Sequence, residues 1–137
     1  MNKVLFDTNI ILDIALKRGS YFEEALKLFN LIDRKIITGH ITASTITDIY
    51  YISKKETGHE KSIRFIKDLV EVVEVIGVEK STILSALTLD MKDFEDAVQV
   101  SASASNEIEV IITRNKDDFT KARLTIVSPR EFLANYY

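Results

Sequence analysis

The chain has 137 residues with 46% hydrophobic and 28% charged content, which is the composition of one globular domain with its own core. It contains no cysteine, which excludes disulfides, thiolate metal sites and thiol nucleophiles, and it has neither a membrane-spanning segment nor a signal peptide, so we expect a cytoplasmic protein with no membrane association. The net charge of −3 argues against a protein that wraps duplex nucleic acid by bulk electrostatics, although cations bound at a carboxylate site would offset part of that charge.

The chain begins with a short apolar strand that ends in polar residues. Residues 4–6 are Val, Leu and Phe, and Asp7, Thr8 and Asn9 follow directly. Such a run predicts a strand buried on both faces, followed by a helix over residues 10–16. An acid at the end of a fully apolar strand needs partners or a metal ion to offset its desolvation. Asp7 is therefore the first candidate for a functional residue.

Helical and strand patterns alternate along the rest of the chain. The polar sequence from Ser128 to Glu131 adds a helix start, with Pro129 in the first turn and the spacing of a capping box. The alternation predicts a parallel sheet covered by helices on both faces, with no linker that would divide it. We expect helices over 21–34, 45–55, 60–70, 79–89 and 94–105, strands over 40–44, 72–76, 109–113 and 124–127, and a polar loop or short helix over 114–119.

Several acids are expected to meet at one edge of this sheet. The carboxyl ends of parallel strands share an edge, which would gather Asp7, the segment 44–48 and the loop 113–118. Asp93 and Asp96 join them if the helix over 94–105 begins at the same edge. Carboxylate oxygens are hard ligands that suit Mg²⁺ or Mn²⁺. The sequence therefore predicts a carboxylate metal site.

Structural explanations exist for most of these acids. Asp48 lies three residues after Thr45, the spacing of a capping box. Asp93 and Asp96 would also be favoured by the positive end of a helix dipole, and Asp118 by an ordinary polar loop. The basic residues between 54 and 67 are interpreted as a solvated helix face.

Four motifs resemble those of the PIN-domain ribonucleases, and of the single-domain VapC-type toxins in particular. They are Phe6 to Asn9 with Asp13, residues 43–45 with Asp48, residues 92–97, and residues 113–119, in the family's order. The resemblance implies one PIN domain over 1–137, folded as a three-layer α/β/α sandwich around a parallel five-stranded sheet. It also implies an endoribonuclease that cleaves RNA with Mg²⁺ or Mn²⁺, as the toxin of a toxin–antitoxin pair.

The resemblance also assigns roles to individual residues. It implies catalytic acids at Asp7, Asp48 and Asp96. It implies metal ligands at Asp7, Asp48, Asp93, Asp96 and Asp118, and orienting or substrate-contacting residues at Thr8, Asn9, Thr113, Arg114 and Asn115. Arg114, Lys116 and Lys121 are expected to contact phosphate.

Two departures from the family pattern support a competing hypothesis. Asp48 stands where the family usually has Glu, and Asn115 stands where many relatives have an acid. The alternative is therefore a PIN fold that has weakened or lost cleavage and works by binding RNA or a partner protein. The family resemblance further implies a homodimer and an antitoxin segment across the active-site groove. Apolar residues in 50–52 and 65–69 could serve either contact, or simply belong to the core.

Overall fold

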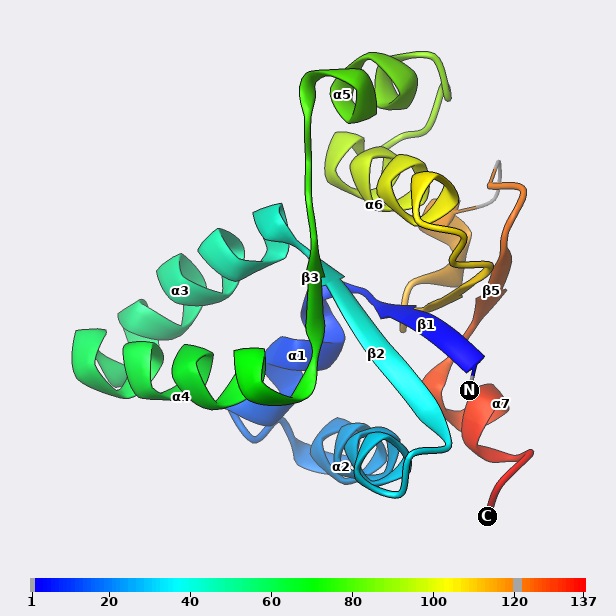
Figure 1. Ribbon diagram of the computed structural model, residues 1–137. Coiled ribbons are helices and arrows are strands. Elements are labelled where there is room, and N and C mark those ends of the chain that lie inside the picture. The colour runs from blue at the N-terminus through cyan, green and yellow to red at the C-terminus, as the bar shows by residue number, and fades with distance from the viewer. Residues whose placement is uncertain (1, 120–121) are drawn as a thin grey trace.

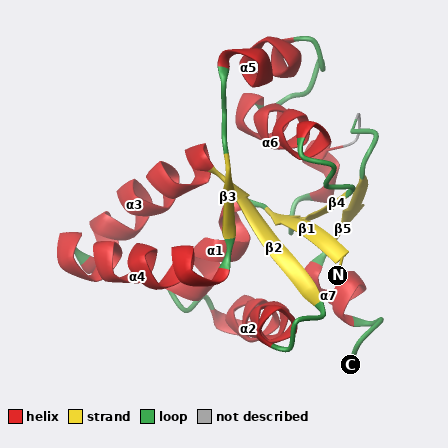
Figure 2. Cartoon of the chain, in the orientation of Figure 1, coloured by secondary structure: helices red, strands yellow, loops and turns green. Residues whose placement is uncertain are grey.

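The computed structural model describes residues 2–119 and 122–137 (Figure 1). Its five strands form one sheet in the order β3-β2-β1-β4-β5, and every neighbouring pair is parallel (Figure 2). The predicted five-stranded parallel sheet is thus confirmed. The strands are β1 (Asn2–Phe6), β2 (Ile37–Thr42), β3 (Glu74–Ile76), β4 (Val110–Ile112) and β5 (Thr125–Val127).

Helices cover both faces of the sheet, which confirms the three-layer sandwich. Val4 and Phe6 of β1 pack with one set of helices, whereas Leu5 between them packs with residues of α6 on the other face. The first face is covered by α1 (Thr8–Ala15), α2 (Gly19–Asp33), α3 (Ala43–Thr57), α4 (His59–Val72) and α7 (Pro129–Leu133), and the second by α5 (Lys80–Leu87) and α6 (Phe94–Ser105). A short 3₁₀ helix, η1 (Lys116–Phe119), lies between β4 and β5. No helix within the described ranges is both long and apolar enough to cross a membrane.

Two predicted strand boundaries were wrong, because residues expected in the strands belong to the neighbouring helices α3 and α4. The strand expected over 40–44 occupies Ile37–Thr42, since the Thr42 side chain accepts a hydrogen bond from the Thr45 amide and caps α3. The strand expected over 72–76 begins at Glu74, because the Val73 amide still donates to the carbonyl of Leu69. The capping box at Ser128 and Glu131 is present as predicted.

The strand order explains where a site can form. From β1 the chain moves outward to β2 and β3, and then returns across the sheet through α5 and α6 to β4, on the other side of β1. The carboxyl ends of β1 and β4 therefore border the crevice at which open parallel sheets bind ligands. Asp7 lies at this point, and its amide donates to the carbonyl of Ile112 at 3.0 Å.

Candidate active site

A cavity of about 250 Å³ opens at the carboxyl ends of β1 and β4. It brings together all five acids predicted as metal ligands, from four separate parts of the chain, together with Thr8, Asn9 and Asn115. We call it the acidic cavity. Its lining consists of Asp7, Thr8, Asn9, Leu12, Asp48, Ile52, Asp93, Glu95, Asp96, Asn115 and Asp118.

Asp7 is held at the centre of a hydrogen-bond network. Its side chain caps α1, accepting from the Thr8 amide at 2.8 Å. Gln99 Nε2 donates to Oδ1 at 3.1 Å, and Thr113 Oγ1 donates to Oδ2 at 2.7 Å. Burial raises the pKa of Asp7 although these hydrogen bonds oppose the shift, and the charge of Asp118 raises it further. Asp7 is fixed in position and disfavoured as an anion, so a bound cation would stabilise its charged form.

Glu95 lies beside Asp48 and was missed by the sequence analysis. Thr8 Oγ1 donates to Glu95 Oε1 at 2.9 Å, and the carboxyl group of Asp48 lies close enough to interact with that of Glu95. Burial, together with the neighbouring carboxyl group of Asp48, raises the pKa of Glu95 to about 7. The capping-box explanation for Asp48 was wrong, because Thr42 caps α3 and Thr45 lies inside that helix. Asp48 instead faces the acidic cavity from α3.

Asp96 and Asp93 enter the cavity from the first turn of α6. Asp93 is the N-cap of this helix, and its Oδ1 accepts from the Asp96 amide at 3.0 Å, which bears out the structural explanation for this acid while leaving it in the cavity lining. Burial raises the pKa of Asp96 to about 8, with further contributions from the charges of Asp7, Asp93 and Asp118. The acids of the cavity therefore repel one another when no cation is bound.

The predicted site residues in the loop after β4 do not all lie in the acidic cavity. Thr113 is fully buried behind Asp7, and its Oγ1 accepts from the Asn115 amide at 3.0 Å. Asn115 reaches the acidic cavity, whereas Arg114 is bound to Asp13 outside it. Lys116 pairs with Glu131 at 2.9 Å. Lys121 lies outside the described residues.

The donor chemistry of the acidic cavity fits a hard divalent cation. Its charged side chains are all carboxylates, the ligands that Mg²⁺ and Mn²⁺ prefer. Across residues 2–119 and 122–137, no three acidic or histidine side chains are already grouped closely enough to hold a metal ion. A cation would offset the repulsion that raises the pKa values of Asp7, Glu95 and Asp96.

Two further residues could have been found from the sequence. Glu95 directly precedes Asp96 at the start of the small-residue helix, and Gln99 lies three positions after Asp96 and so on the same helix face. Gln99 is fully buried, and its Oε1 has no hydrogen-bond partner in the described part of the chain. A buried amide among small residues signals a specific polar partner, which here is Asp7.

Comparisons with known proteins agree with this geometry. Residues 3–117 match the family model described as PIN domain. The chain is 25% identical to Ribonuclease VapC1 of Aquifex aeolicus, over 95% of its own length and 92% of that protein's. Its fold is similar to that of a chain in the DNA-bound VapBC2 structure from Rickettsia felis, with a TM-score of 0.71 and 16% identity over 92% of this chain and 97% of that one. It is also similar to that of a chain in a toxin–antitoxin complex from Klebsiella pneumoniae, with a TM-score of 0.69 and 22% identity over 92% of this chain and 97% of that one. The chain belongs to the PIN domain family.

Proposed function

We propose that this protein is an Mg²⁺- or Mn²⁺-dependent endoribonuclease that cleaves RNA phosphodiester bonds as the toxin of a toxin–antitoxin pair. The observation that carries the proposal is the single cavity that gathers five predicted acidic ligands and Glu95 at the switch point of the sheet. A curated relative that bears the name ribonuclease supports the activity, and structures that contain VapBC complexes support the pairing with an antitoxin.

The main role of the residues in the acidic cavity is to hold carboxylate groups in position around a divalent ion. A divalent ion bound there supplies the positive charge that polarises the phosphate and activates water. Asp7, Asp48, Asp93, Asp96 and Asp118 would hold it, together with Glu95. Thr113 and Gln99 fix both oxygens of Asp7, and Thr8 fixes one oxygen of Glu95.

The alternative of a non-catalytic PIN module rested on Asp48 and Asn115 standing where many relatives have different residues. The position of Glu95 weakens the argument from Asp48. Glu95 sits against Asp48 and supplies a second carboxylate where the shorter side chain leaves space. The variant Asp48→Glu separates the two hypotheses. An increase in both metal affinity and cleavage would mark the native site as a weakened nuclease, whereas no cleavage in either protein would favour a binding module.

The assembly and setting follow from the same proposal. We propose one PIN domain over 1–137, acting on RNA in the cytoplasm as a homodimer that an antitoxin silences. One continuous sheet supports the single domain. Exposed apolar side chains at Tyr51 and Ile52 on α3, of which Ile52 lines the acidic cavity, offer a surface for the antitoxin.

The test is cleavage of single-stranded RNA by the purified chain with Mg²⁺ or Mn²⁺, together with thermal unfolding in the same ions. Both the cleavage and a saturable rise in Tm should be lost in Asp7→Asn and Asp96→Asn. Asp117→Asn is the matched control, because Asp117 lies next to Asp118 in η1 without lining the cavity. Cleavage that persists in Asp7→Asn would overturn the assignment of the site.

A further inference from the structure

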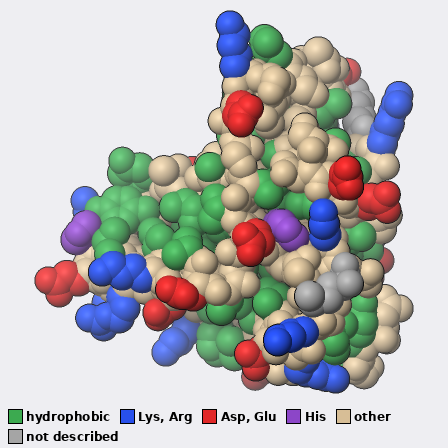
Figure 3. Space-filling view, viewed as in Figure 1, with side chains coloured by type: hydrophobic (Ala, Val, Ile, Leu, Met, Phe, Trp, Pro, Cys, Tyr) green, Lys and Arg blue, Asp and Glu red, His purple; other side chains and the backbone are tan. Residues whose placement is uncertain are grey.

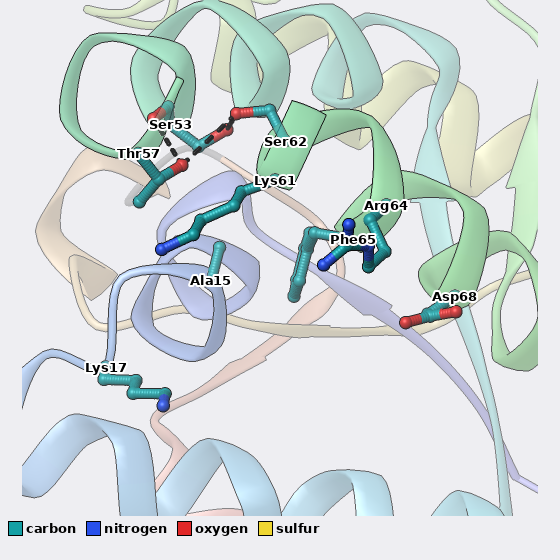
Figure 4. Close-up of a pocket in the computed structure, with 9 residues that line it drawn as sticks. All are labelled: Ala15, Lys17, Ser53, Thr57, Lys61, Ser62, Arg64, Phe65 and Asp68. Carbon is teal, nitrogen blue, oxygen red and sulfur yellow. Dashed lines mark hydrogen bonds between the residues drawn. The ribbon is translucent and has the colours of Figure 1, made fainter. Parts of the chain in front are cut away.

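A second, larger cavity lies between the C-terminal end of α1 and the hairpin formed by α3 and α4. Its volume is about 510 Å³, and three cations line it: Lys17 from the turn after α1, and Lys61 and Arg64 from α4 (Figure 4). Asp68 is the acid of the same lining, so the lining carries net positive charge in a chain whose formal net charge is −3. We call this the basic cavity. Figure 3 shows Lys and Arg side chains along the lower edge of the α3–α4 hairpin, with Asp and Glu side chains between them.

A hydroxyl network fixes the wall that carries Lys61 and Arg64. Ser53 Oγ of α3 lies 2.8 Å from Ser62 Oγ of α4, and both serines are buried. Thr57 Oγ1 donates to the carbonyl of Ser53 at 2.9 Å (Figure 4). Ser62 Oγ donates to the carbonyl of Gly58 at 2.9 Å. These bonds join the two helices at their turn. The cations of α4 are therefore presented from a backbone that is held in place, although their own side chains are exposed.

None of the three cations forms an ion pair in the described part of the chain. Among residues 2–119 and 122–137, the ion pairs involve Asp13, Glu24 and Glu131 as acids, and none of them reaches Lys17, Lys61 or Arg64. The three cations line one open space from two sides, which is an arrangement that suits an anion.

The same two helices line both cavities. On α1, Leu12 borders the acidic cavity and Ala15 the basic one; on α3, Asp48 and Ile52 border the acidic cavity, and Ser53 and Thr57 the basic one. At 1.5 Å per residue, the positions on α1 are separated by about 4.5 Å along the helix axis. The two cavities therefore adjoin the same two helices, α1 and α3.

We propose that the basic cavity is a second subsite for RNA, in which Lys17, Lys61 and Arg64 bind backbone phosphates of nucleotides beyond the one that is cleaved. The proposal rests on the ribonuclease function proposed above. Phe65 lines the same cavity, half-buried, where it also packs against the core. Cations combined with an aromatic ring are typical of sites for single-stranded nucleic acid. Lys61 and Arg64 are exposed, in keeping with the interpretation as a solvated helix face, and the proposal adds a binding role to that face.

The test measures binding of fluorescent single-stranded RNA by anisotropy in EDTA, so that no cleavage occurs, across a series of salt concentrations. For single strands each phosphate contact contributes about 0.7 to the slope of log K against log salt, and about fivefold in affinity near 0.1 M salt. Lys61→Gln/Arg64→Gln should therefore reduce the magnitude of this negative slope by about 1.4. Lys17→Gln, on the opposite wall, should reduce the magnitude by about 0.7.

The matched control is Lys54→Gln/Lys55→Gln, which removes the same charge from the same hairpin outside the basic cavity. This control should keep the native slope. Equal slopes for the two double variants, or no RNA binding by the native chain, would overturn the subsite. Loss of binding to polyglutamate but not to RNA in Lys61→Gln/Arg64→Gln would also overturn it, in favour of an acidic protein partner.

Because the measurement needs no metal ion, its result is separate from that of the cleavage assay. If Lys61→Gln/Arg64→Gln binds RNA with the native salt slope and the native chain cleaves RNA, the subsite is rejected and the ribonuclease function stands. RNA bound through Lys61 and Arg64 but not cleaved would support the subsite and reject the nuclease.

Discussion

Arg114 forms a bidentate ion pair with Asp13, in which Nε donates to Oδ2 at 2.8 Å and Nη2 to Oδ1 at 3.0 Å. The Asp13 side chain is buried in α1, and the guanidinium lies 3.9 Å from the centre of the Tyr21 ring. The pair ties the loop after β4 to the helix that follows β1. The same loop carries Asn115 and Asp118 to the acidic cavity. A contact outside the cavity therefore positions residues inside it.

Replacing Arg114 by Ala should destabilise the fold, because it leaves the Asp13 carboxylate buried without its main partner. Loss of one member of such a pair costs roughly 3 kcal/mol, and Lys should recover only part of it, since its ammonium lacks the planar guanidinium that donates two parallel hydrogen bonds to Asp13 and stacks on the Tyr21 ring. Urea unfolding measures the difference. Lys116→Ala, which breaks an exposed pair with Glu131, is the control and should shift the midpoint little. An Arg114→Ala midpoint equal to that of the native chain would show that the pair does not hold the loop.

Without a divalent ion, the protein should become less stable as the pH rises from about 5 to about 8. The pKa of Asp96 is raised to about 8 and that of Glu95 to about 7, both well above the ordinary carboxyl values. In this range the native state binds more protons than the unfolded chain, so the free energy of unfolding falls with increasing pH. Thermal unfolding in EDTA measures the decline. It should be clearly shallower in Asp96→Asn and unchanged in Asp117→Asn; equal declines in all three proteins would place the titration elsewhere.

Glu95→Gln should weaken the metal site although the sequence motifs assign this residue no role. The change keeps the acceptor for the Thr8 hydroxyl but removes a carboxylate next to Asp48. We expect a loss of metal affinity of roughly 10-fold to 100-fold, read from the ion concentration that half-saturates the rise in Tm. Glu71→Gln on the exposed side of α4 is the control. Native metal affinity in Glu95→Gln would restrict the site to the aspartates.

Sequence patterns sufficed where one local rule acted alone. The helix from Phe94 to Ser105 has the expected bounds, because Asp93 caps it and no strand competes for its residues. At Thr42 two rules compete, since the residue favours a strand and also caps α3, and the predicted boundary was wrong. Acids that follow strands could be placed together because parallel strands end at one edge. The pairing of Asp13 with Arg114, 101 positions apart, depends on helix and loop orientation that no local pattern contains.

The close packing beneath the active site gives a last prediction, for Gly39 of β2. A Cβ at this position would lie 2.5 Å from Cε2 of Phe6 and 2.7 Å from Cδ1 of Ile32, and Phe6 is fully buried directly before Asp7. Gly39→Ala should therefore destabilise the fold by roughly 1 to 3 kcal/mol in urea unfolding, because a packed core resists added volume. It should also weaken the metal response, because a displaced Phe6 ring perturbs the end of β1, which Asp7 directly follows. Gly77→Ala, where a Cβ meets nothing within 4 Å, is the control and should leave both properties native. If the two variants are equally stable, the core around Phe6 has room that the structure does not show.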